Sequence, residues 1–160
     1  VEVLQGILQA HFGLQNYHQT IVFADKLLAL SSNLKESTPK ALLIKGKALR
    51  LMGQYSDAED SFGLLIQEYK TEQGAEALLL LALGYQEKGD LIGSNELIFD
   101  YSEGFSPFDY WYGSLFLLLA KNYVELGELF QAKATLQSIL DQSTNATVKE
   151  NAASILNSLN

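Results

Sequence analysis

Apolar residues recur every three or four positions along most of the chain, and short polar turns interrupt this helical period. A turn motif of similar composition recurs around Tyr17, Tyr55, Leu91 and Leu129, at intervals of 38, 36 and 38 residues. Each motif stands between two helix-like stretches, and no stretch of sequence sustains the alternation of a strand. The pattern therefore predicts an all-helical chain of about four repeated helix-turn-helix hairpins.

The turns also give approximate boundaries for one repeat domain over residues 1–160. We expect four hairpins and a C-terminal helix that caps the array, although the same helix also fits the start of a further repeat. The expected hairpins cover about 1–34, 39–70, 75–105 and 107–141, and the C-terminal helix covers 146–159.

Glycines stand where the first helices of the hairpins end. Gly53, Gly89 and Gly127 are expected to take the left-handed backbone conformation that terminates a helix, because a Cβ would strain it. Gln15 replaces glycine in the first hairpin.

Prolines and short polar residues predict three helix starts. The expected caps are Thr38 before Pro39, Ser106 before Pro107, and a capping box of Thr147 and Glu150.

The hairpins share a pattern of packing residues. The first helix carries a large apolar residue, a leucine with a small residue, and then tyrosine, and the second carries alanine and a large apolar residue. The fourth hairpin has Phe116, Leu119, Ala120, Tyr123, Ala132 and Leu136 in these places. The pattern resembles the tetratricopeptide repeat over roughly residues 3–140, although Lys45 replaces the usual leucine and Ser94 the usual alanine.

This resemblance implies an all-α, right-handed superhelical α-solenoid whose first helices line a concave groove. It also implies a non-catalytic scaffold for protein–protein interaction, similar to a segment of a larger bacterial tetratricopeptide protein. A second hypothesis is a structural or self-assembly segment of a larger repeat protein. Self-association would then pair the basic residues 37–56 with the acidic residues 89–120.

Helical period, applied to the first helices, predicts an apolar groove with basic spots. Such a surface suits a peptide or helix that brings hydrophobic anchors and an acidic side chain or carboxylate. The expected groove residues are Lys40, Leu43, Lys47, Arg50, Leu79, Leu83, Gln86, Leu117, Lys121 and Val124.

Residues 104–113 hold five of the 17 aromatic residues. Their spacing, continued by Leu115 and Leu119, favours a buried stripe on one helix over an aromatic cage for a ligand. Tyr110 lies off this stripe, and we expect Tyr110 and Phe105 to be exposed to a partner. The sequence leaves open whether the segment is all core or partly a contact site.

The sequence offers little for chemistry. The chain has no cysteine, and a predicted turn separates its only histidines, His11 and His18, so we expect no metal site. Gly46 and Lys47 lack the flanking residues of a phosphate-binding loop. Carboxylates stand where solvation is expected. We therefore expect no catalytic residues, no cofactor and no enzymatic activity.

Net charge and hydropathy limit the partners. A formal charge of -8 argues against nucleic acid and anionic membranes as partners. No apolar run approaches the roughly 20 residues that span a bilayer, so we expect no direct membrane insertion. The segment shows no targeting signal, and the cytoplasm and a bacterial cell envelope or periplasm both stay open.

Overall fold

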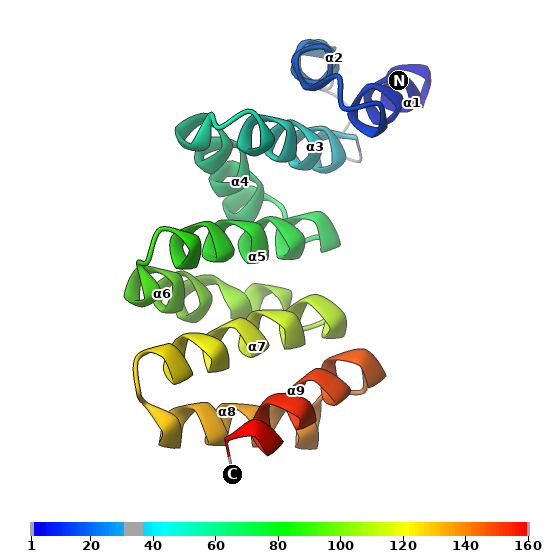
Figure 1. Cartoon of the computed structure of the whole chain (residues 1–160). Helices are drawn as coiled ribbons and strands as arrows, with labels where there is room; N and C mark the ends of the chain where they lie inside the picture. Colours follow the sequence, from blue (N-terminus) through cyan, green and yellow to red (C-terminus); the bar gives the residue numbers. More distant parts are fainter. Residues whose placement is uncertain (1, 31–36, 160) are drawn as a thin grey trace. The chain divides into compact units, whose positions relative to one another are not determined.

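The computed structural model describes residues 2–30 and 37–159, and every regular element in these ranges is helical (Figure 1). The all-helical hairpin fold expected from the sequence is confirmed. Val1, Asn160 and the expected end of the first hairpin at residue 34 lie outside the described residues. The elements are α1 (Glu2–Gly13), α2 (Tyr17–Leu30), α3 (Thr38–Leu51), α4 (Tyr55–Glu68), α5 (Glu72–Glu87), α6 (Leu91–Tyr101), the 3₁₀ helix η2 (Ser102–Phe105), α7 (Asp109–Glu125), α8 (Leu129–Gln142) and α9 (Ala146–Ser158).

The chain divides into two compact units, Val1–Ala77 and Leu78–Asn160. The first contains α1 to α4 and the first residues of α5, and the second contains the rest of α5 and all later elements.

Small residues bring the helices of the first unit close together. Leu8 of α1, Ala24 and Leu27 of α2, and Ala41 of α3 form one buried cluster. An alanine on each of two helices lets their backbones approach closely, and the leucines fill the remaining space.

In the next hairpin, the absence of a side chain at Gly46 makes room for an aromatic ring. A Cβ at Gly46 of α3 would lie 2.5 Å from Cε1 of Phe62, a residue of α4 that is almost fully buried. The ring therefore occupies the space that any larger residue at position 46 would need, so Gly46 is a packing position.

The second unit has a comparable core between α7, α8 and α9. Leu117 and Ala120 of α7 pack with buried residues of α8 and α9, namely Leu136, Ile139, Val148 and Ala152. Gly113 extends this contact, because a Cβ there would lie 2.5 Å from Cγ1 of Val148.

The predicted turns are confirmed in their backbone conformation. Gly53, Gly89 and Gly127 have φ angles of 75°, 82° and 77°, and Gln15 takes the same left-handed region with φ 60°. At each turn the next residue closes the helix with a long backward hydrogen bond; for example, the Gln54 amide donates to the Leu49 carbonyl at 2.9 Å. Gln15 therefore takes the place of glycine, at the cost of a strained conformation.

Two predicted caps are wrong. The N-cap of α3 is Ser37, and the helix itself begins at Thr38. The N-cap of α9 is Asn145, whose Oδ1 accepts from the Val148 amide at 3.1 Å. The Asn145 side chain thus accepts a hydrogen bond from one of the free amides of the first turn. Thr147 lies inside the helix and forms no capping box.

The helix start predicted at Ser106 and Pro107 is also wrong. η2 buries Phe105 completely, and Ser106 continues this turn in helical conformation. The chain is therefore still turning at Pro107, and α7 begins only at Asp109. The exposure expected for Phe105 is likewise wrong, because η2 turns this ring into the core.

Two glycine substitutions separate packing from helix propensity. We expect Gly46→Ala to lower the free energy of unfolding by about 1–3 kcal/mol, because the Phe62 ring must shift. The matched control is Gly63→Ala in α4, where a Cβ meets nothing within 4 Å. That change should raise the free energy of unfolding by up to about 1 kcal/mol, through helix propensity alone. Urea unfolding measures both, and stabilisation by both variants would contradict the packing role of Gly46.

Candidate functional site

The basic row expected on α3 is partly neutralised within the first unit. Lys40 is exposed, whereas Leu43 is buried and Lys47 and Arg50 are half-buried. The Lys47 ammonium forms an ion pair with the Glu76 carboxylate on α5. An acidic partner would have to compete with Glu76 for Lys47, which leaves Lys40 as the exposed cation of this row.

A second ion pair explains a departure from the repeat pattern. Lys45 Nζ lies 2.7 Å from Asp25 Oδ1, and this contact joins α3 to α2. A lysine is accommodated where leucine is usual because its charge has a partner on the neighbouring helix.

In the second unit, the expected residues of α5 and α7 have unequal exposure. Leu79, Leu83 and Gln86 of α5 are half-buried. On α7, Lys121 is exposed and Val124 is half-buried. Leu117 is 7% exposed and belongs to the core with α8 and α9, so it is a packing residue beneath the exposed surface of α7.

A buried amide fixes Gln86 in place. Gln86 Nε2 donates to Asn122 Oδ1 at 2.8 Å, and Asn122 Nδ2 donates to Ser94 Oγ at 2.9 Å and Asn95 Oδ1 at 2.8 Å. Asn122 is completely buried, and both of its donor hydrogens are used. We name these four residues the Asn122 network; it joins α5, α6 and α7.

Sequence reasoning missed the Asn122 network, although one signal was present. Ser94 stands where the repeat pattern has alanine, and its hydroxyl oxygen accepts a hydrogen bond from the side-chain amide of Asn122. A small polar residue in a small apolar position indicates a hydrogen-bond partner on a facing helix, because an unpaired buried hydroxyl is costly.

The aromatic segment is partly core and partly surface. Leu115 and Leu119 are buried, whereas Trp111, Tyr112 and Phe116 keep some exposure. Tyr110 is 46% exposed, as expected, and its ring meets Trp111 edge to face at 4.9 Å between centroids.

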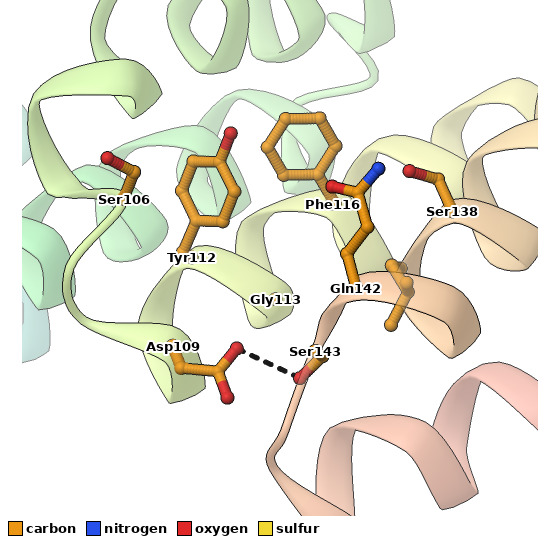
Figure 2. A pocket seen from close by; sticks show the side chains of 9 residues that line it. Ser106, Asp109, Tyr112, Gly113, Phe116, Ser138, Gln142 and Ser143 are labelled. Atoms are coloured by element: carbon orange, nitrogen blue, oxygen red, sulfur yellow. Dashed lines mark hydrogen bonds between the residues drawn. The ribbon is translucent and has the colours of Figure 1, made fainter.

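A cavity of about 310 Å³ opens beside this segment (Figure 2). Its residues come from the chain before α7, from the first turns of α7, and from the end of α8 and the residue that follows it. Sequence reasoning missed it, because periodicity on one helix does not show which residues of two helices enclose a space. The lining residues are Ser106, Asp109, Tyr112, Gly113, Phe116, Ser138, Ile139, Gln142 and Ser143.

Asp109, at one end of the cavity, is held by three hydrogen bonds. Its Oδ1 accepts from Ser143 Oγ at 3.0 Å, and its Oδ2 accepts from the Thr144 hydroxyl at 2.6 Å and the Thr144 amide at 2.9 Å. The Thr144 hydroxyl is the main cause that lowers the pKa of Asp109, with smaller help from Ser143. Burial, and secondarily the nearby Glu103 carboxylate, raises the pKa of Tyr112.

In the part of the chain that the structure describes, the histidines and carboxylates do not gather into a metal site. Within residues 2–30 and 37–159, no three side chains of histidine, aspartate or glutamate lie close enough together to hold a metal ion. His11 stacks on Phe23 with 5.0 Å between ring centroids, and His18 is exposed on α2. The described helices also include none that is long and apolar enough to cross a membrane.

Two stretches of the chain match a known protein family. The family model of the tetratricopeptide repeat matches residues 40–71 and 114–146. The first match covers most of α3 and all of α4, and the second covers most of α7 and all of α8. No curated protein matches the chain.

The charge of Asp109 stabilises the connection between α8 and α9. A carboxyl whose pKa is lowered in the folded state contributes stability above its unfolded pKa, and that contribution is lost as the pH falls through the folded pKa. We expect Asp109→Asn to lower the free energy of unfolding by about 1 kcal/mol at pH 7, through weaker hydrogen bonds.

The difference in the free energy of unfolding between wild type and Asp109→Asn should begin to shrink as the pH falls below 3.8, the ordinary pKa of an aspartate carboxyl. It should vanish at lower pH. Urea unfolding at several pH values measures it. Asp100→Asn, at an exposed position on α6, is the control and should have no such effect. A difference that persists unchanged below the folded pKa would contradict the role of the charge.

Proposed function

Because the chain belongs to the tetratricopeptide-repeat family, whose repeats generally mediate protein–protein interactions, we propose that it is a non-catalytic scaffold that binds a protein segment on its first helices. In the first unit the binding residues are Lys40, Lys47 and Arg50 of α3. In the second unit they are Leu79, Leu83, Gln86, Lys121 and Val124 of α5 and α7.

The observation that carries this proposal is the hydrogen bond between Gln86 and Asn122. It ties the end of the α5 row to α7 next to Lys121, so two successive first helices present their residues from a fixed framework. Leu79, Leu83 and Val124 supply partly exposed apolar surface, and Lys121 supplies a positive charge. A peptide or helix with hydrophobic anchors and an acidic group matches this combination.

The first unit supports the same partner chemistry. Lys40 is exposed, and Lys47 already binds a carboxylate, that of Glu76. A partner carboxylate that displaced Glu76 would be held in the same geometry. The net attraction for an acidic partner is therefore smaller than three fully exposed basic residues at positions 40, 47 and 50 would give.

A non-catalytic role agrees with the state of the titratable groups. Asp109 has a lowered pKa and accepts three hydrogen bonds, so its carboxylate is a weak base near neutral pH. The raised pKa values of Tyr112 and Tyr123 come mainly from burial, which keeps both phenols protonated.

Charge reversal on lysines tests the binding rows. A partner is first identified by affinity capture from the native source, and its affinity is then measured by calorimetry for Lys40→Glu, Lys121→Glu and the control Lys149→Glu on α9. We expect Lys121→Glu and Lys40→Glu to raise the Kd about tenfold or more each, and Lys149→Glu to leave it unchanged. Equal affinity of the wild type and all three variants would contradict the proposed rows.

Self-assembly is the second candidate, because apolar side chains are exposed on the second helices of the hairpins. Phe130 of α8 is 83% exposed, and Ile92 and Phe99 of α6 are more than half exposed. Molar mass at increasing protein concentration separates the two functions. An oligomer that Phe130→Glu dissociates would support assembly, and a monomer throughout would contradict it.

A further inference from the structure

The cavity in Figure 2 lies outside the proposed binding rows and arises from an extension of one helix. The repeat match begins at residue 114, whereas α7 already begins at Asp109. The five residues 109–113 therefore add more than one helical turn before the repeat, and this turn runs alongside the end of α8. Because Gly113 has no side chain, α9 approaches α7 closely at this residue. The space between Gly113 and the end of α8 stays open and forms the cavity.

The walls of the cavity combine two aromatic rings with neutral polar groups. Tyr112 and Phe116 lie on α7 with 4.9 Å between ring centroids, and Gln142 and Ser138 stand on the α8 side (Figure 2). Among the described residues, the Tyr112 hydroxyl and the side chains of Ser138 and Gln142 have no hydrogen-bond partner. These groups can bond a ligand without breaking a contact in the protein.

The charge around the cavity has one sign. Its lining contains the Asp109 carboxylate and no basic side chain, and residues 89–120 contain five acidic residues and no basic one. Glu103 is close enough to Tyr112 to raise its pKa. Three hydrogen bonds fix the Asp109 carboxylate, yet Oδ1 accepts only one of them and can take another.

We propose that this cavity binds the arginine side chain of a partner segment. The Tyr112 and Phe116 rings are tilted by 50° to each other, so the planar guanidinium would stack on one of them and donate to Asp109 Oδ1, the hydroxyls and the side-chain oxygen of Gln142. A volume of about 310 Å³ is at the small end for ligand pockets and suits one side chain. Phosphate and carboxylate groups are excluded, since no cation lines the cavity.

Arginine fits better than lysine because of its shape. Its guanidinium carries five N–H donors in one plane, which match acceptors on opposite walls, and its face can lie against a ring. An ammonium group is a strongly hydrated point charge that would use fewer of these acceptors.

A titration followed by NMR tests the proposal on the full chain. The probe is Nα-acetyl-arginine amide, and Nα-acetyl-citrulline amide is its neutral isostere. We expect saturable shift changes for the arginine probe at the backbone amides of 109–116 and 138–143, with a Kd on the order of millimolar. The citrulline probe should bind at least about tenfold more weakly, because it lacks the charge.

Variants then place the probe in the cavity. Ser138→Phe should fill the space, and Gln142→Leu should remove an acceptor; each should weaken binding by about tenfold or more. Gln131→Leu, at an exposed position of α8 away from the cavity, is the matched control and should bind as wild type does. Circular dichroism checks that each variant keeps its helices.

Three results would overturn the proposal: no saturable change with the arginine probe, equal binding of the citrulline probe, or binding unaffected by Ser138→Phe. None of them bears on Lys40 or Lys121, so the proposed function stands or falls separately.

Discussion

One buried side-chain amide, that of Asn122, connects three helices of the second compact unit. Both of its donor hydrogens and its oxygen are used by partners on α5 and α6. A buried amide that loses a partner costs about 1–3 kcal/mol, so the three helices are held in one arrangement more firmly than apolar contact alone would hold them. Gln86 belongs to this network and to the proposed binding row, and the position of that row on α5 therefore depends on Asn122.

Within each unit, the space left where a glycine has no side chain decides where helices pack closely. Gly46 admits the Phe62 ring, and Gly113 admits Val148. The extension of α7 beyond the repeat then leaves a cavity beside its aromatic rings. Close packing at Gly113 and the open cavity thus both occur at the start of α7. This first turn precedes the repeat match, so the repeat supplies no helix that fills the space beside it.

The sequence was sufficient for the helical hairpins and their turns, because periodicity and glycine placement are local signals. The φ angles of Gly53 and Gly127 follow directly from their places after a helix. The sequence was not sufficient for the start of α7, since helical period does not reveal the 3₁₀ turn that precedes this helix and buries Phe105. Nor could it reveal that Lys47 is paired with Glu76, a contact between helices that are not neighbours in the chain.

A double-mutant cycle between Gln86 and Asn122 tests the central claim most directly. The free energy of unfolding is measured for the wild type, Gln86→Ala, Asn122→Ala and the double variant. The Asn122 network predicts a coupling energy between about 0.5 and 3 kcal/mol, because each single change removes the same hydrogen bond. A coupling of zero within error would show that this bond does not join α5 to α7, and would contradict the framework on which the proposed binding row rests.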